Sequence, residues 1–165
     1  GTAEAMLTRN CAVLMRLCHH FAPAMVSRGR GSIVIFGSGA GFAGGPNMVA
    51  YSATKAFDMV FAEALWAELH DSGVDVLGLI LSKTDTPALR RLEFERGRIA
   101  SLDERPKDTA TVKEVIGEAF ENLANGPTRI VGENTRAGIQ MLGSLPRNDA
   151  VRLMMAASAA AMGEG

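Results

Sequence analysis

Two short apolar runs, separated by one long helical segment, constrain the fold of this chain more than any other feature. Residues 32–36 and 74–81 are rich in Val, Ile and Leu, as is typical of strands buried on both faces of a sheet. Residues 50–71 between them are apolar on nearly every side and end at Asp71-Ser72-Gly73, which predicts a long helix packed on more than one side. A strand, a crossover helix and a second strand favour a parallel sheet covered by helices.

The remaining segments add helices and one further strand. Residues 3–27 have apolar side chains at helical spacing, and we expect Pro23 to kink or end the first part of that helix. The polar, charged stretch from residue 84 to about residue 108 is expected to be mobile or partly helical. The other expected elements are a helix at 111–123 capped by Thr111 and Glu114, a strand at 129–131, and helices at 136–142 and 149–162. The sequence thus predicts an α/β domain with about three strands.

Composition narrows the classes of partner. Apolar residues make up 47% of the 165 residues and the net charge is −1, so we expect a globular core and no basic surface for nucleic acid or an anionic membrane. Two cysteines are too few for a disulfide framework, which favours a reducing, cytoplasmic setting. No stretch is apolar for long enough to span a bilayer. The chain starts at Gly1 rather than Met, as if cut from a longer protein or carrying a residual tag residue at Gly1.

The most informative polar pair is Tyr51 and Lys55, four residues apart in the helix of residues 50–71. Residues at that spacing share one face of a helix and reach a common ligand. Free tyrosine has a pKa of about 10 and is a poor base at neutral pH, but a nearby cation favours the phenolate. The pair is therefore a candidate proton-transfer unit. Taken alone, the same spacing also fits two residues that merely decorate a helix.

Two further polar residues lie where they can join this pair. Ser38 comes just after the strand at 32–36, and ligand sites in parallel sheets lie beyond the carboxyl ends of the strands. A hydroxyl there can bond a substrate oxygen beside the tyrosine. Asn10 lies in the helix before that strand, where a buried amide must find hydrogen-bond partners. A buried amide without a catalytic role is an alternative interpretation of Asn10.

In order and spacing, Asn10, the helix through Pro23, Ser38, the Tyr51-x-x-x-Lys55 pair and the strand at 74–81 resemble the short-chain dehydrogenase/reductase family. The resemblance covers nearly all of residues 5–145. It implies a partial Rossmann-like, doubly wound parallel sheet, with residues 1–165 as the C-terminal portion of a single Rossmann domain. It also implies roles. Tyr51 would be the general acid/base and Ser38 would orient the carbonyl or alcohol. Lys55 would hold the nicotinamide ribose and favour the phenolate, and Asn10 would continue a proton relay through water to Lys55.

The same resemblance implies NAD or NADP as cofactor and exposes two departures from the family. Thr86 falls at the family threonine that contacts the nicotinamide carboxamide, and Thr84 is a second candidate, but Leu81-Ser82 stand where Pro-Gly is usual. The family's Gly-rich turn, Thr-Gly-x-x-x-Gly-x-Gly, and its Asn-Asn-Ala-Gly stretch are not in this sequence. In the family, this turn and the first strands of the fold supply most of the adenosine and pyrophosphate site.

Three other motifs have weaker functional interpretations. Residues 39–44 match the dinucleotide pattern G-x-G-x-x-G, but Gly45-Pro46 interrupts the step into a helix, so a loop beside the site is favoured. Gly37-Ser38-Gly39 lacks the spacing of a nucleophile elbow. The side chains of Cys18-His19-His20 point in different directions on a helix, so they do not converge on a metal.

The sequence supports two hypotheses of different class. The first is an NAD(P)-dependent oxidoreductase that moves a hydride between nicotinamide and a carbonyl or secondary alcohol, with Tyr51 moving the proton. The second is a non-catalytic fragment of such an enzyme, which keeps the active-site helix and the oligomer surface but does not bind cofactor. We expect a small-molecule substrate, no nucleic-acid or membrane partner, and a homodimer or homotetramer formed through helices 3–27 and 50–71.

Overall fold

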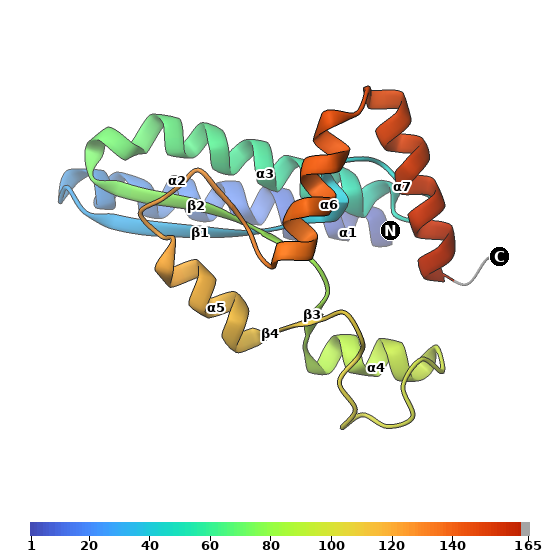
Figure 1. Cartoon of the computed structure of the whole chain (residues 1–165). Helices are drawn as coiled ribbons and strands as arrows, with labels where there is room; N and C mark the ends of the chain where they lie inside the picture. Colours follow the sequence, from blue (N-terminus) through green and yellow to red (C-terminus); the bar gives the residue numbers. More distant parts are fainter. Residues whose placement is uncertain (163–165) are drawn as a thin grey trace.

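A three-stranded parallel sheet organises the computed structural model, which describes residues 1–162 (Figure 1). Its strands are β1 (Gly31–Ser38), β2 (Val74–Leu81) and β5 (Thr128–Ile130), in the order β1-β2-β5. Helices cover both faces, since α2 (Val13–Ser27) and α3 (Val49–Leu69) lie on one face and α5 (Val112–Glu121) lies on the other. The predicted α/β class with about three strands is confirmed, and the arrangement is a partial doubly wound sheet.

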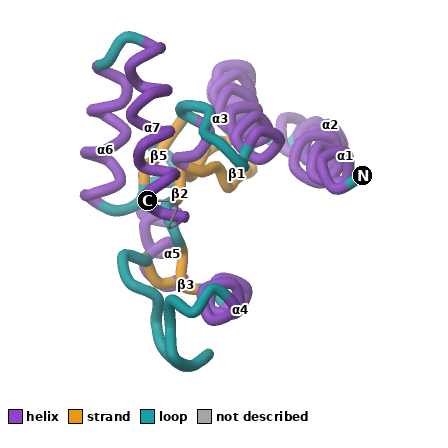
Figure 2. The backbone as a smooth tube through the Cα atoms, turned by 90° about the vertical axis from the view of Figure 1, so that its right-hand side faces the viewer, coloured by secondary structure: helices purple, strands orange, loops and turns teal. Residues whose placement is uncertain are grey.

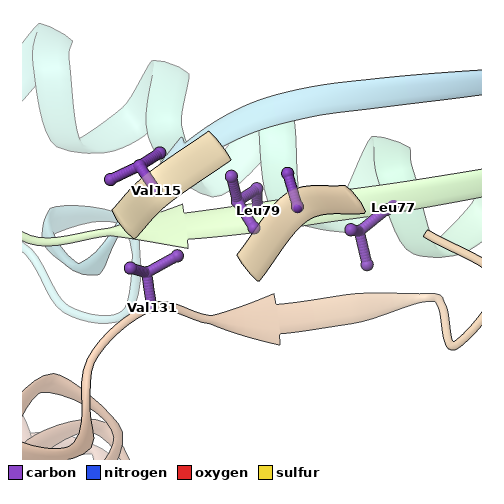
Figure 3. Close-up of a cluster of buried hydrophobic side chains, with 5 residues drawn as sticks. Leu77, Leu79, Val115 and Val131 are labelled. Atoms are coloured by element: carbon purple, nitrogen blue, oxygen red, sulfur yellow. The ribbon is translucent and has the colours of Figure 1, made fainter. Parts of the chain in front are cut away.

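β2 is the centre of the hydrophobic core because its side chains alternate between two buried layers. The layer on the α5 side consists of Leu77, Leu79, Val115, Ala119 and Val131 (Figure 3). The layer on the α3 side consists of Ile35, Ala62 and Val76, with half-buried side chains of α2 and α3 around them. Strand side chains alternate between faces with a period of two, so one apolar run serves both layers.

The register of the sheet brings two strand ends to one edge. β1 and β2 pair in parallel along their whole length, from Gly31 opposite Val74 to Ser38 opposite Leu81. Ser38 and the segment that follows β2 therefore start from the same carboxyl edge, which is where open parallel sheets bind ligands. β1 and β5 are the two edge strands of this sheet among the described residues.

The helix predicted for residues 3–27 is present, but its winding changes once. It consists of α1 (Thr2–Leu7), the π-helical turn η1 (Thr8–Ala12) and α2. Pro23 lies inside α2, which continues to Ser27, so the expectation that the helix ends at Pro23 is wrong. Pro23 is exposed, and water can hydrate the carbonyl group that loses its helical partner there.

The segment after β2 has more regular structure than its polar sequence indicates. It contains β3 (Thr84–Asp85), α4 (Pro87–Glu95) and β4 (Ala110–Thr111). β3 and β4 form a separate parallel pair, and α4 with the loop after it projects from the carboxyl edge of the main sheet (Figure 1, Figure 2). The expected partial helix is confirmed, whereas strands of two residues are too short to give a periodic pattern.

The remaining elements are η2 (Gly39–Gly41), η3 (His70–Ser72), α6 (Glu133–Ser144) and α7 (Arg147–Met162). Thr111 and Glu114 begin α5 with the predicted capping box, in which each side chain accepts a hydrogen bond from the other residue's backbone amide. Both expected C-terminal helices are present and begin earlier than predicted. Within residues 1–162, no helix combines the length and the hydropathy that a membrane crossing needs.

Candidate active site

α3 buries polar side chains and exposes apolar ones, which is the reverse of an ordinary surface helix. Tyr51, Thr54, Lys55 and Asp58 recur at i, i+3, i+4 and i+7 and so share one face; we call them the polar stripe. Asp58 is 3% exposed in this stripe, whereas Val60 is 63% exposed. Burying polar groups destabilises a fold unless they are paired, so the stripe indicates a function rather than a packing need.

Lys55 lies at the centre of the polar stripe. Its Nζ donates hydrogen bonds to the Phe36 carbonyl oxygen at 2.9 Å and to Asp58 Oδ2 at 2.8 Å. An ammonium group has three donors, so one N–H stays available to a further group. Nζ also lies 6.0 Å from the centroid of the Tyr51 ring. The two hydrogen bonds therefore fix the cation beside the phenol ring.

Asn10 joins the polar stripe from another helix. It lies in η1, and such π turns are frequent at functional sites. Asn10 Nδ2 donates to Thr54 Oγ1 at 2.9 Å, and Thr54 Oγ1 donates to the Tyr51 carbonyl oxygen at 2.9 Å. Sequence reasoning did not select Thr54, although its position three residues after Tyr51 on the same face was an available signal. The role of Asn10 in a water relay to Lys55 stays a prediction.

Ser38 ends β1 and begins the loop that crosses α3. Its Oγ accepts a hydrogen bond from the Ala40 amide at 3.2 Å, which caps η2. Phe36, which anchors Lys55, lies two residues earlier in the same strand. Gly41 then touches α3 so closely that a β-carbon there would lie 2.6 Å from the carbonyl carbon of Lys55. Strand and loop together tie Ser38 to the helix that carries the polar stripe.

Thr84 and Thr86 follow β2 at the carboxyl edge. Thr84 Oγ1 donates to the Ser82 carbonyl oxygen at 3.5 Å, which is a long hydrogen bond. Thr86 is the N-cap of α4, and its Oγ1 accepts a hydrogen bond from the Leu89 amide at 3.2 Å. Both hydroxyls therefore have local structural partners, and their contact with a nicotinamide stays a prediction.

Asp58 is the candidate residue that sequence reasoning missed. Burial raises the pKa of its carboxyl group, and the Lys55 ammonium opposes that rise. Oδ2 binds Lys55, but Oδ1 has no hydrogen-bond partner among the residues that the structure describes. Burial raises the pKa of the Cys11 thiol in η1, and the Asp58 carboxylate raises it further. The available signal was one acidic residue inside the apolar middle of the predicted helix.

Known proteins resemble this chain over the segment that carries the polar stripe. The family described as short chain dehydrogenase matches residues 2–96. A 7beta-hydroxysteroid dehydrogenase of Mediterraneibacter gnavus is 30% identical over 142 residues, which cover 82% of this chain and 51% of that relative. A very-long-chain 3-oxoacyl-CoA reductase of Neurospora crassa is 37% identical over 89 residues, which cover 54% of this chain and 26% of that relative. The chain spans about half the length of the hydroxysteroid dehydrogenases it matches.

Solved structures have the same architecture. A structure from a study of 7beta-hydroxysteroid dehydrogenase stereoselectivity has a TM-score of 0.77 at 26% identity and covers 92% of this chain and 57% of its own. A short-chain dehydrogenase from Sphingobium yanoikuyae in complex with NADPH has a TM-score of 0.57 at 25% identity, covering 86% of this chain and 56% of its own. Because the family match extends over more than half of its residues, this chain belongs to the short-chain dehydrogenase family.

Proposed function

We propose that this chain supplies the proton-transfer site of an oxidoreductase that moves a hydride between a nicotinamide cofactor and a carbonyl or secondary alcohol. The observation that carries the proposal is the polar stripe, in which a fixed ammonium lies 6.0 Å from the centroid of the Tyr51 ring. Family membership supports oxidoreductase chemistry, and the named relatives are a hydroxysteroid dehydrogenase and an oxoacyl-CoA reductase. Those names concern secondary alcohols and ketones, which supports the substrate class.

Tyr51 is the general acid and base in this proposal. Its hydroxyl donates a proton to the oxygen of a carbonyl that becomes an alcohol, and in the reverse direction its phenolate accepts that proton. The Lys55 ammonium stabilises the phenolate through space. Ser38, at the end of β1, bonds the same substrate oxygen. Asn10 holds the stripe in place through Thr54.

The residues at the carboxyl edge fit the nicotinamide end of NAD or NADP. Lys55 keeps one N–H for a ribose hydroxyl, and Tyr51 is half-buried rather than enclosed. Thr84 and Thr86 would contact the carboxamide from the segment after β2. When bound, the nicotinamide supplies or accepts the hydride. The solved relative in complex with NADPH supports a nicotinamide cofactor.

Calorimetric titration of the full chain with NADH and with NADPH tests this proposal. We expect saturable binding of at least one of them and oxidation of the bound dinucleotide in the presence of a ketone. Tyr51→Phe removes only the hydroxyl, so it should retain cofactor binding and lose at least about 100-fold in turnover. A chain that binds the dinucleotide and turns over equally well with Phe at position 51 contradicts the assignment.

A second candidate is a non-catalytic part of such an enzyme, which keeps the active-site helix and the oligomer surface. Two observations favour it: the apolar strand β1 lies at an edge of the sheet among the described residues, and the sequence has no Gly-rich phosphate-binding turn of the family type. A folded chain that binds neither NADH nor NADPH is the result this candidate requires, and saturable binding excludes it.

We make three further proposals, which hold for either candidate function. Residues 1–165 form the C-terminal portion of a single Rossmann domain. This is supported by the strand order and by the share of the relative's length that the chain covers. The protein works in the cytoplasm, as its two cysteines favour. Copies of the chain associate through the outward faces of α2 and α3, which expose large apolar side chains.

A further inference from the structure

The surroundings of Asp58 make its carboxylate unfavourable for the stability of the fold. The residue is 3% exposed, and its Oδ1 has no hydrogen-bond partner in the described part of the chain. An unsatisfied buried polar atom destabilises a fold, because it has lost its hydrogen bonds to water without replacing them. An apolar side chain of similar size would avoid that loss at this position, so the acidic residue requires a different explanation.

Lys55 supplies that explanation, because its largely enclosed ammonium group needs a partner of opposite charge. Its side chain is 17% exposed, and a charge held away from water must be paired and hydrogen-bonded. One of its two partners is the uncharged carbonyl group of Phe36, and the other is Asp58 Oδ2 at 2.8 Å. Without a partner that holds it, the Lys55 ammonium would not be fixed beside the Tyr51 ring. The site therefore needs a counter-ion at the position that Asp58 occupies.

We propose that Asp58 is a positioning residue that keeps the Lys55 ammonium charged and fixed beside Tyr51. It acts through Lys55 and touches neither substrate nor cofactor. Together with the Phe36 carbonyl, it occupies two of the three N–H groups and leaves one for a ligand. The proposal deepens the proposed function and rests on it, since a fixed cation is useful here only if Tyr51 exchanges a proton.

Other ionisable groups near α3 are arranged differently from Asp58. Burial raises the pKa of the Cys11 thiol of η1, the Asp58 carboxylate raises it further, and the Lys55 ammonium lowers it. The strand that anchors Lys55, β1, has no ionisable side chain. The elements packed on α3 also carry Glu4, Arg9, His70, Asp71, Asp75 and Arg129. Glu4 pairs with the amino terminus, Arg129 pairs with Glu118, and Asp75 lies opposite Ser32, at the other end of β1 from Phe36.

Trace acetylation of the full chain with acetic anhydride, measured by mass spectrometry across a pH series, tests the proposal without cofactor or turnover. Only a neutral amine reacts, so the labelling midpoint of each lysine reports its loss of charge. Asp58→Asn keeps an oxygen that can accept from Lys55 but removes the charge. We expect its Lys55 midpoint to fall by at least about one pH unit, while exposed Lys107 and Lys113 on the same chain keep theirs.

Glu63→Gln is the matched control, because it removes one exposed carboxylate from the same helix. An unchanged Lys55 midpoint in Asp58→Asn, or an equal shift in Glu63→Gln, would overturn the proposal. So would an Asp58→Asn chain that unfolds where Glu63→Gln stays folded, since the carboxylate would then be a structural requirement. Because labelling needs no bound nicotinamide, a chain that fails to bind NADH or NADPH still gives one of these results.

The melting temperature of a double variant tests whether the Lys55–Asp58 pair stabilises the fold. The double variant Asp58→Leu, Lys55→Met replaces both charges by apolar side chains, and such replacements of buried ion pairs are often neutral or stabilising. We expect it to melt at or above the temperature of the wild-type chain. Clear destabilisation of the double variant would show that the pair has a structural role. It would overturn the proposal that Asp58 positions Lys55 for Tyr51.

Discussion

Gly41 places the loop after β1 directly against the backbone of α3. A β-carbon at this position would lie 2.6 Å from the carbonyl carbon of Lys55 and 2.7 Å from the amide nitrogen of Ala56. No side-chain rotation relieves a clash with backbone atoms. We therefore expect Gly41→Ala to push the Ser38 loop away from the polar stripe and to lower the free energy of unfolding by about 1–3 kcal/mol. Urea unfolding of the full chain measures this change.

Gly44 offers a matched control for that prediction because it lies in the same loop. A β-carbon there meets nothing within 4 Å in the described structure. Gly44→Ala should leave stability unchanged or raise it slightly, since alanine restricts the unfolded chain more than glycine does. Equal stability of the two alanine variants would show that the loop does not depend on the close approach.

The Thr54 hydroxyl connects two residues of the site that are far apart in sequence. It accepts from the Asn10 amide and donates to the Tyr51 carbonyl oxygen, both at 2.9 Å. Thr54→Val keeps the shape but leaves the half-buried Asn10 amide without that acceptor, so we expect a loss of about 1–3 kcal/mol in unfolding free energy. Thr54→Ser retains the hydroxyl and should lose much less. A valine variant as stable as the serine variant would contradict the connection.

Elements with strong periodic patterns could be predicted from the sequence, whereas those fixed by tertiary contacts could not. The apolar runs of β1 and β2 and the all-round apolar pattern of α3 each depend on local side-chain types. β3 and β4 contain two residues each and exist because of the pairing between them. Tyr51 and Lys55 could be selected from their spacing. The bond from Asn10 to Thr54 could not be predicted, because it spans 44 residues.

Arg90 holds together the element pair β3–α4 and the loop that follows it. Its Nε and Nη2 donate to the two carboxylate oxygens of Asp85 at 2.6 and 2.7 Å, and its Nη1 donates to the carbonyl oxygens of Leu102 and Asp103. Hydrogen bonding from the Arg90 guanidinium lowers the pKa of Asp85. Since the folded pKa is the lower one, the pair stabilises this segment above about pH 4 and loses that contribution as the pH falls through the folded value.

Hydrogen exchange of residues 85–105, followed by mass spectrometry and corrected for the chemical exchange rate, checks the pH dependence. Near neutral pH we expect faster exchange in Asp85→Asn than in the wild-type chain. The difference should shrink as the pH falls through the lowered pKa of Asp85, because the wild-type carboxyl group becomes neutral there. Glu95→Gln, an exposed change on α4, should match the wild type throughout. A difference that stays constant with pH would contradict the role of the carboxylate charge.

At the scale of the whole molecule, the two faces of the sheet differ in what covers them. On one face, α2 and α3 pack inward through half-buried side chains such as Leu14 and Phe61. Their outward sides still expose large apolar residues, namely Val13, Met15, Leu17, Phe21, Val49 and Val60. Exposed apolar side chains mark an interaction surface where they gather into a patch. This arrangement supports the association of copies through α2 and α3 that the apolar pattern of both helices predicts.

Substitutions at Phe21 and Phe120 distinguish association through α2 and α3 from a general effect of exposed aromatic residues. Phe21 of α2 is 51% exposed and Phe120 of α5, on the other face of the sheet, is 73% exposed. Phe21→Glu places a charge in the proposed interface, where desolvation without a partner is unfavourable, so we expect light scattering to give the mass of a monomer. Phe120→Glu makes the same chemical change outside that surface and should keep the dimeric or tetrameric mass of the wild type. A wild-type chain that is already monomeric, or dissociation caused equally by both variants, would rule out α2 and α3 as the specific interface.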